Sequence, residues 1–191
     1  PAASARWLIT GNEAAGFGAL QGGVRFVAAY PITPATELLE WMAPALVKVG
    51  GALVQAEDEL ASINMILGAS YGGVPSLTAT SGPGLALMRE SLGLGVAAEV
   101  PIVVVDVMRT GPSTGIATKT EQADLNIALY GLHGDAPHVV VAPNYRGSSG
   151  RGLQFTRAIN ADWGNLEVQD VIAAVDHLVA QGIADPERLG I

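Results

Sequence analysis

The chain has 191 residues, of which 49% are hydrophobic and 15% are charged. It is therefore long and apolar enough to form one large domain, or one domain with part of a second. Its 10 basic and 18 acidic residues give a net charge of −8 with no cluster of Lys and Arg, which argues against nucleic-acid binding. Cysteine is absent, which excludes disulfides, a thiolate nucleophile and a cysteine-ligated iron–sulfur cluster in this sequence.

Membrane spans, export and metal binding have no signal in the sequence. No apolar run approaches the ~20 residues of a membrane span, and no basic segment followed by an apolar one opens the chain. The histidines His133, His138 and His177 are scattered without the spacing of metal ligands. We therefore expect a cytoplasmic protein without membrane contact and without a metal site of its own.

From Trp7 to Pro143, short apolar runs alternate with longer segments of helical character. Strands are predicted at 7–10, 24–29, 52–55, 76–79, 101–107 and 138–142. Helices are predicted at 13–20, 34–47, 59–71, 85–97 and 121–130. Near-continuous hydrophobic strands separated by helices are typical of a parallel sheet that is covered on both faces. The expected fold class is α/β, with an open parallel sheet and helices on both of its faces.

Five polar or glycine-rich stretches stand at the predicted carboxyl ends of strands, where open α/β sheets bind ligands. They are TGNEAAG (10–16), YPITPAT (30–36), QAEDE (55–59), TSGPG (80–84) and MRTGPSTG (108–115). Any one of them is explained by an ordinary strand-to-helix turn with a capping Ser or Thr. Five of them in one sheet favour a ligand site at this edge.

The composition of the chain changes after residue 143. A glycine-rich loop, NYRGSSGRG, precedes an amphipathic helix predicted at 168–179, which Gly182 ends. The last residues, 189–191, have the character of a strand start. We therefore divide the chain into a domain at 1–143 and a second, incomplete segment at 144–191.

Residues 8–143 resemble the pyrimidine-binding domain in the alpha chain of 2-oxoacid:ferredoxin oxidoreductases. The resemblance rests on five motifs in order: GNEAAGFGAL, AAYPITPATELLEW, QAEDELASINMILGASYGG, TATSGPGLALM and VVDVMRTGPSTGIATKTEQADL. Each motif alone is a weak signal, whereas YPITP, QAEDE, TSGPG and RTGPSTG together form a specific one. The resemblance implies a thiamine-diphosphate-binding fold and a protein that, with a partner subunit, oxidatively decarboxylates a 2-oxoacid to acyl-CoA.

The resemblance assigns the activation of the cofactor to Glu57. Thiamine diphosphate needs a carboxylic acid at its aminopyrimidine ring, and a buried glutamate suits this because desolvation raises its pKa toward neutral pH. Glu57 matches the activating glutamate of the family and is the expected catalytic residue. From residue types alone, Glu57, Asp58 and Glu59 would all be solvated acids at a helix start. We keep that interpretation for Asp58 and Glu59.

The resemblance also implies substrate and cofactor contacts. Thr33 and Arg109 are expected to bind the substrate, and the Arg109 guanidinium suits the substrate carboxylate. Lys119 is expected to assist with a second acidic group, with an ordinary surface lysine as the open alternative. The loop at 80–84 is expected to present backbone groups to the pyrimidine, through Ser81, Gly82 and Gly84.

Several parts that the reaction needs are absent from this sequence. There is no GDG…N motif, so Mg²⁺ and the diphosphate are expected to be held by a beta subunit that shares the thiamine diphosphate. Because the chain has no cluster ligands, electrons are expected to leave to ferredoxin through that subunit. The expected partners are a beta subunit, ferredoxin through it, a 2-oxoacid and coenzyme A. The chain alone is expected to be inactive.

Residues 139–191 resemble a second family, the prolyl-oligopeptidase-family serine peptidases with their α/β-hydrolase domain. The similarity rests on VVVAPNYRGSSGRGLQF and AINADWGNLEVQDVIAAVDHLVAQGIADPERLGI. In that family LGI leads into the strand that presents the catalytic serine, and this segment ends before it. Two alternatives therefore stay open: a fragment of such a peptidase that lacks its triad, and an inactive chimeric α/β domain.

Overall fold

The computed structural model describes residues 9–119, 121–133, 153–158 and 166–182. The chain forms two compact units, whose main parts are Gly11–Val140 and Val141–Leu189. The assignment of the second unit to a partial hydrolase-like domain stays a prediction.

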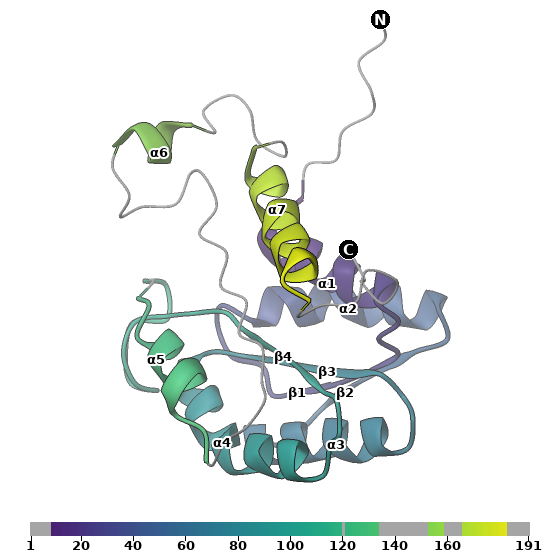
Figure 1. Ribbon diagram of the computed structural model, residues 1–191. Coiled ribbons are helices and arrows are strands. Elements are labelled where there is room, and N and C mark those ends of the chain that lie inside the picture. The colour runs from purple at the N-terminus through teal and green to yellow at the C-terminus, as the bar shows by residue number, and fades with distance from the viewer. Residues whose placement is uncertain (1–8, 120, 134–152, 159–165, 183–191) are drawn as a thin grey trace, which may run out of the picture. The chain divides into compact units, whose positions relative to one another are not determined.

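In its described residues, the first unit contains four parallel strands in one open sheet (Figure 1). They are β1 (Phe26–Ala29), β2 (Ala52–Gln55), β3 (Ser76–Thr80) and β4 (Val103–Asp106). The spatial order is β2-β1-β3-β4, and each neighbouring pair is parallel. The predicted open parallel α/β sheet is therefore confirmed.

Helices of the same unit cover both faces of this sheet. They are α1 (Gly11–Gln21), α2 (Thr36–Lys48), α3 (Glu59–Tyr71), α4 (Gly82–Ala97) and α5 (Asp124–Tyr130). Helices α1 and α2 lie on one face, and α3 and α4 lie on the other (Figure 1). This arrangement explains why every residue of the central strand β3 is buried, since both faces of the sheet are covered.

Strand β1 shows how the sheet separates two hydrophobic cores. Val27 and Ala29 belong to the core formed with α1 and α2, whereas Ala28 belongs to the core formed with α3 and α4. Successive side chains of a strand point to opposite faces, so neighbouring residues of β1 enter different cores. All three side chains are almost completely buried.

Two helices begin elsewhere than the sequence predicts. Helix α4 begins at Gly82 rather than Leu85, because Ser81 is its N-cap and Pro83 fits the first turn, where a missing N–H costs no hydrogen bond. Helix α5 begins at Asp124, three residues later than expected. Both helix starts border the carboxyl edge of the sheet.

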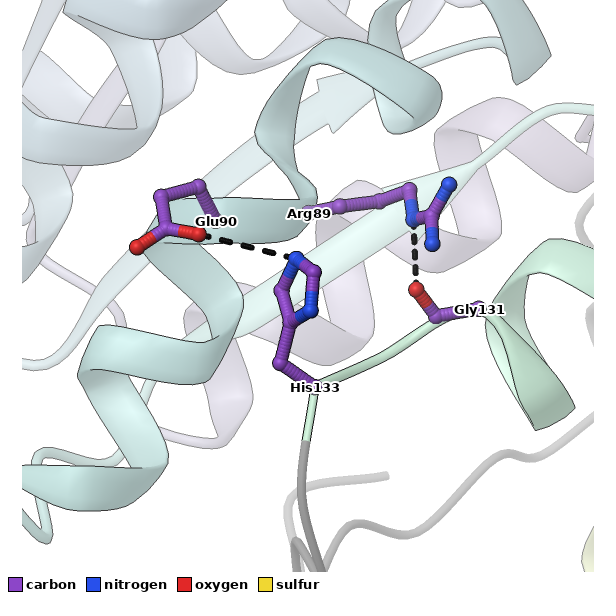
Figure 2. A network of polar contacts seen from close by, with 4 residues as sticks. All are labelled: Arg89, Glu90, Gly131 and His133. Carbon is purple, nitrogen blue, oxygen red and sulfur yellow. Dashed lines mark hydrogen bonds and ion pairs between the residues drawn. The ribbon is translucent and has the colours of Figure 1, made fainter.

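Two neighbouring side chains of α4 fasten the turn that follows α5 (Figure 2). Arg89 Nε donates a hydrogen bond of 2.5 Å to the carbonyl oxygen of Gly131. Glu90 forms an ion pair of 3.5 Å with His133, and both of these side chains are largely exposed. The end of α5 is thus held against α4 by the partly buried arginine contact.

The described residues of the second unit form α6 (Leu153–Arg157) and α7 (Leu166–Ala180). Helix α7 includes the amphipathic helix predicted at 168–179, and Gly182 follows it with a φ of +69°, as expected for a glycine after a helix. The sequence does not predict α6. Of the helices in the described parts of both units, none is long and apolar enough to cross a membrane.

The predicted strand at 138–142 and residues 7–8 of the first predicted strand lie outside the described residues. Ile9 and Thr10, the other half of that first strand, have no strand conformation. The sheet described above therefore begins with β1.

Candidate functional site

The order of the strands creates a topological switch point between β1 and β3. From β1 the chain passes to β2 on one side of it and then returns to β3 on the other side. Open α/β sheets bind ligands at such a point, beyond the carboxyl ends of the strands. The residues that follow β1 to β4 in turn are found there, because all four strands run parallel: Thr33, Glu57, Ser81 and Arg109.

Arg109 is a buried guanidinium that bonds to main-chain oxygens. Its side chain donates to the carbonyl oxygens of Thr33 and Ser113, each at 3.0 Å, and the residue is only 6% exposed. Among the described residues, no carboxylate lies within ion-pair distance of it, and its Nε has no hydrogen-bond partner. A buried charge without a counter-ion is costly. The guanidinium is therefore prepared to bind an anion, and a carboxylate matches its geometry.

Thr33 is held through its main chain and leaves its side chain exposed. A cis peptide bond joins it to Pro34. The carbonyl oxygen of Pro34 accepts a hydrogen bond of 3.2 Å from the Asn12 side chain, so α1 helps to hold this loop. The Thr33 hydroxyl is thus accessible beside the arginine that the Thr33 carbonyl fixes.

The three acids after β2 have different environments. Asp58 is the N-cap of α3, and its Oδ1 accepts a hydrogen bond of 2.6 Å from the main-chain N–H of Ala61, as expected of an acid at a helix start. Glu57, expected to be buried, is exposed, whereas Glu59, expected to be solvated, is only 8% exposed. Both expectations about burial were wrong, because Glu59, the first residue of α3, packs against Gly84 of α4, whereas Glu57 lies in the loop before the helix.

Residues 80–84, which we continue to call the TSGPG loop, end β3 and begin α4, and packing within the chain explains their glycines. A Cβ at Gly84 would lie 2.7 Å from Cγ of Glu59 and 2.9 Å from its Oε1, and a Cβ at Gly82 would lie 2.6 Å from Oδ2 of Asp124. Each glycine therefore makes room for a buried carboxylate. Ser81 caps α4 without a side-chain hydrogen bond, and its fully buried Oγ has no partner among the described residues.

Sequence reasoning missed two acids at this edge, Asp106 and Asp124. Asp106 ends β4, and burial, followed by the charge of Asp124, raises its pKa from 3.8 to about 7. Its Oδ1 is buried and has no hydrogen-bond partner among the described residues. An acid at the end of an otherwise apolar strand is a signal that could have identified Asp106. Asp124 had no signal beyond its place near a helix start.

Lys119 has an exposed side chain at the end of the loop that follows β4. Its main-chain oxygen accepts a hydrogen bond of 2.7 Å from Thr110, which closes this loop on itself.

Within the described residues, no group of three or more His, Asp and Glu side chains could hold a metal ion.

The fold and the site define an open α/β domain with a ligand site at the carboxyl edge of its sheet. Residues 17–146 match the family described as pyruvate flavodoxin/ferredoxin oxidoreductase, thiamine diphosphate-binding. This match covers more than half of the chain, and the chain belongs to that family. The predicted resemblance is therefore confirmed.

Relatives of the chain are subunits of larger enzymes. The 2-oxoglutarate synthase subunit KorA of Archaeoglobus fulgidus is 53% identical over 71% of this chain and 39% of its own length. The alpha subunit of 2-oxoacid:ferredoxin oxidoreductase 2 of Aeropyrum pernix is 39% identical over 94% of this chain and 29% of its own length. The chain therefore spans well under half the length of these relatives.

A solved structure shows the same fold. It is the 2-oxoglutarate:ferredoxin oxidoreductase from Magnetococcus marinus, with 2-oxoglutarate, coenzyme A and succinyl-CoA bound. It is 60% identical to this chain, with a TM-score of 0.65, over 68% of this chain and 23% of the solved chain.

The C-terminal resemblance is also confirmed, because residues 123–191 match the prolyl oligopeptidase family. This match covers little more than a third of the chain and overlaps the first one at 123–146. The alignment with the Aeropyrum pernix subunit, at 94% of the chain, must also extend past residue 146. The family shown for the chain is thus the oxidoreductase family.

The described residues fit one half of thiamine diphosphate. The edge carries more acids than bases, and Asp124 and Glu59 already flank the start of α4, where a phosphate would otherwise be favoured. A diphosphate would meet like charges there, whereas an uncharged aminopyrimidine would not. The exposed Glu57 carboxyl is of the chemical type that pairs with a ring nitrogen. The donor set therefore fits the pyrimidine and not the diphosphate.

Proposed function

We propose that this chain is the pyrimidine-binding part of the alpha subunit of a cytoplasmic 2-oxoacid:ferredoxin oxidoreductase. With a beta subunit, it would oxidatively decarboxylate a 2-oxoacid to acyl-CoA. The observation that carries the proposal is the Arg109 guanidinium, which is buried at the switch point, bonds to main-chain oxygens and forms no ion pair with any acid among the described residues. Membership of the thiamine diphosphate-binding family supports the same proposal.

In this proposal Glu57 holds the proton that is exchanged with the aminopyrimidine nitrogen. Its exposure in this chain agrees with a site that a second subunit completes and buries. The loop with Ser81, Gly82 and Gly84 would lie against the pyrimidine. The bound cofactor supplies the nucleophilic carbon of its thiazolium ring, and Mg²⁺ and the diphosphate would be held by the beta subunit.

The remaining residues would bind the 2-oxoacid. Arg109 would pair with its carboxylate, the Thr33 hydroxyl would donate a hydrogen bond to it, and Lys119 would contact a second acidic group where the substrate has one. Coenzyme A would accept the acyl group. Electrons would leave to ferredoxin through the beta subunit, because this chain has no cysteine to bind an iron–sulfur cluster.

The test is to assay the chain alone and after assembly with a beta subunit from a relative. Ferredoxin or viologen reduction is measured with 2-oxoglutarate or pyruvate, coenzyme A, Mg²⁺ and thiamine diphosphate. We expect no turnover by the chain alone and turnover by the complex. A stable complex that reduces no acceptor with any 2-oxoacid would overturn the proposal, as would full activity of the chain alone.

The alternative function, a peptidase, rests on the match at 123–191. The sequence GPSTG at 111–115 has the spacing of a nucleophile elbow, but no helix follows it directly in the structure, as the strand-to-helix turn of an elbow requires. The carbonyl of Ser113 instead accepts a hydrogen bond from Arg109. We therefore expect no hydrolysis of acyl-peptides by the purified chain.

A further inference from the structure

A single buried carboxylate contacts two of the loops at the candidate site. Asp124, the first residue of α5, is 6% exposed, and its oxygens occupy the space where a side chain at Gly82 would be. Its Oδ2 also accepts a long hydrogen bond, of 3.4 Å, from the main-chain N–H of Arg109. The TSGPG loop and the arginine loop are therefore held against the same side chain.

The way in which Asp124 bonds to Arg109 matters for the charge of the site. The acid accepts from the main chain of the arginine, and no ion pair links it to the guanidinium. An acid that neutralised the guanidinium would compete with a ligand carboxylate. Bonded to the main chain instead, Asp124 fixes the position of the residue and leaves the guanidinium charge for the ligand.

The guanidinium is fixed from its other end by the carbonyls of Thr33 and Ser113. Together with the Asp124 contact, this makes a continuous chain of contacts from the loop after β1, through Arg109, to the loop after β3. The separation between the bound carboxylate and the pyrimidine loop would depend on it.

We propose that Asp124 is a positioning residue that holds the substrate-binding arginine in place relative to the TSGPG loop. The inference rests on the proposed function, in which Arg109 binds the 2-oxoacid carboxylate. A shift of about 1 Å in a group that binds a reacting substrate can cost on the order of 10²-fold in rate. Loss of the Asp124 carboxylate should therefore mainly affect the kinetic constants for the 2-oxoacid.

The chain offers a matched control. Glu59 is also a buried acid that lies against a glycine of the same loop, Gly84, but the described contacts give it no bond to Arg109. Both acids support the start of α4, and only Asp124 connects it with the arginine. A purely structural role would make the two acids behave alike.

The first measurement is amide hydrogen exchange of the full chain, which needs neither cofactor nor partner. Asp124→Ala should speed exchange of the Arg109 amide by about tenfold or more, because that N–H loses its acceptor. Asp124→Asn, which retains an oxygen acceptor, should restore most of the protection. Glu59→Gln should leave Arg109 exchange within about twofold of the unmodified chain, whatever it does to the melting temperature. Equal effects of Asp124→Ala and Glu59→Gln on this amide would overturn the proposal.

The second measurement is the kinetics of the assembled complex. Asp124→Ala should raise KM for the 2-oxoacid about tenfold or more while KM for coenzyme A stays within about twofold. Gly82→Ala should act in the same way, since its Cβ would displace the Asp124 carboxylate. The double variant, in which the smaller side chain at 124 makes room for that Cβ, should recover melting temperature but not KM.

The outcomes separate this proposal from the function on which it rests. An active complex in which Asp124→Ala folds and retains the normal KM for the 2-oxoacid would overturn the positioning role alone. A complex without any 2-oxoacid activity would overturn the proposed function and this inference with it. Recovery of both the melting temperature and the KM for the 2-oxoacid in the double variant would show that Asp124 acts only through packing, and would overturn the positioning role.

Discussion

The Arg109 guanidinium donates a hydrogen bond of 3.0 Å to the carbonyl oxygen of Thr33, and so joins the loop after β4 to the loop after β1. The two strands are not neighbours, since β3 lies between them. The contact therefore crosses the switch point of the sheet. It places a buried positive charge where a ligand of this fold is expected to bind.

Arg109→Lys should weaken the use of the 2-oxoacid by the assembled complex about 10²-fold in kcat/KM. Lysine retains the charge but cannot bond to both carbonyls and present a planar pair of donors to a carboxylate. The control is Arg25→Lys, because Arg25 also donates to main-chain oxygens, those of Leu20 and Val24, at the opposite edge of the sheet. Steady-state kinetics with varied 2-oxoacid would measure both. Similar losses in the two variants would contradict a substrate role for Arg109.

Glu57→Gln should lower turnover of the complex by about 10²–10⁴-fold, because the amide cannot exchange a proton with the aminopyrimidine. Assembly should be unaffected, because glutamine is close to glutamate in size and retains a hydrogen-bonding side chain. Glu59→Gln should act mainly on folding, with a loss of roughly 1 kcal/mol in the free energy of unfolding, because its buried carboxyl packs against Gly84. The ratio of the two turnover losses is the measurement. Equal, small losses would show that Glu57 has no proton-transfer role.

Asp106→Asn should stabilise the chain at alkaline pH. The pKa of Asp106 is about 7 in the folded chain and 3.8 as its ordinary value, so the folded state binds more protons between these pH values. The free energy of unfolding should therefore fall as pH rises from about 4 to about 7, and the full cost should persist above pH 7. At about 1.36 kcal/mol per pKa unit, the substitution should recover up to about 4 kcal/mol at pH 8.

Urea unfolding of both forms at pH 4, 6 and 8 would measure this effect. The control is Glu40→Gln, which removes one negative charge at an exposed position of α2. If Asp106→Asn and Glu40→Gln shift the pH dependence equally, the effect comes from net charge and not from burial of Asp106.

Arg89→Ala should lower the free energy of unfolding by about 1.5–3 kcal/mol, the range for a hydrogen bond to a charged group. It leaves the Gly131 carbonyl without its donor at the turn after α5 (Figure 2). The matched change, His133→Ala, removes the neighbouring ion pair and should cost less than about 1 kcal/mol, because both of its side chains are largely exposed. Denaturant unfolding at pH 6 and pH 8 would compare them. A larger effect of His133→Ala would contradict this order.

The sequence by itself determined the layers of the domain and the edge that carries the site. Short runs rich in β-branched and apolar residues, such as Val103–Val105, predicted the strands, and the segments between them predicted helices from their length and pattern. Residues that follow the carboxyl ends of parallel strands share one edge. The strand pattern is therefore sufficient to place Thr33, Glu57 and Arg109 at the same edge of the sheet.

The tertiary structure alone decided which acids are buried and what the glycines of the TSGPG loop are for. Whether Glu57 or Glu59 is covered depends on α4, a helix far along the chain, and not on the local pattern of three adjacent acids. Asp124 is significant because its carboxylate packs against Gly82 and accepts a hydrogen bond from the Arg109 amide. The hydrophobic pattern of the sequence does not predict these contacts. The physical reason is that hydrophobic pattern reports which way a side chain faces, whereas the partner of a buried charge is set by the packing of distant elements.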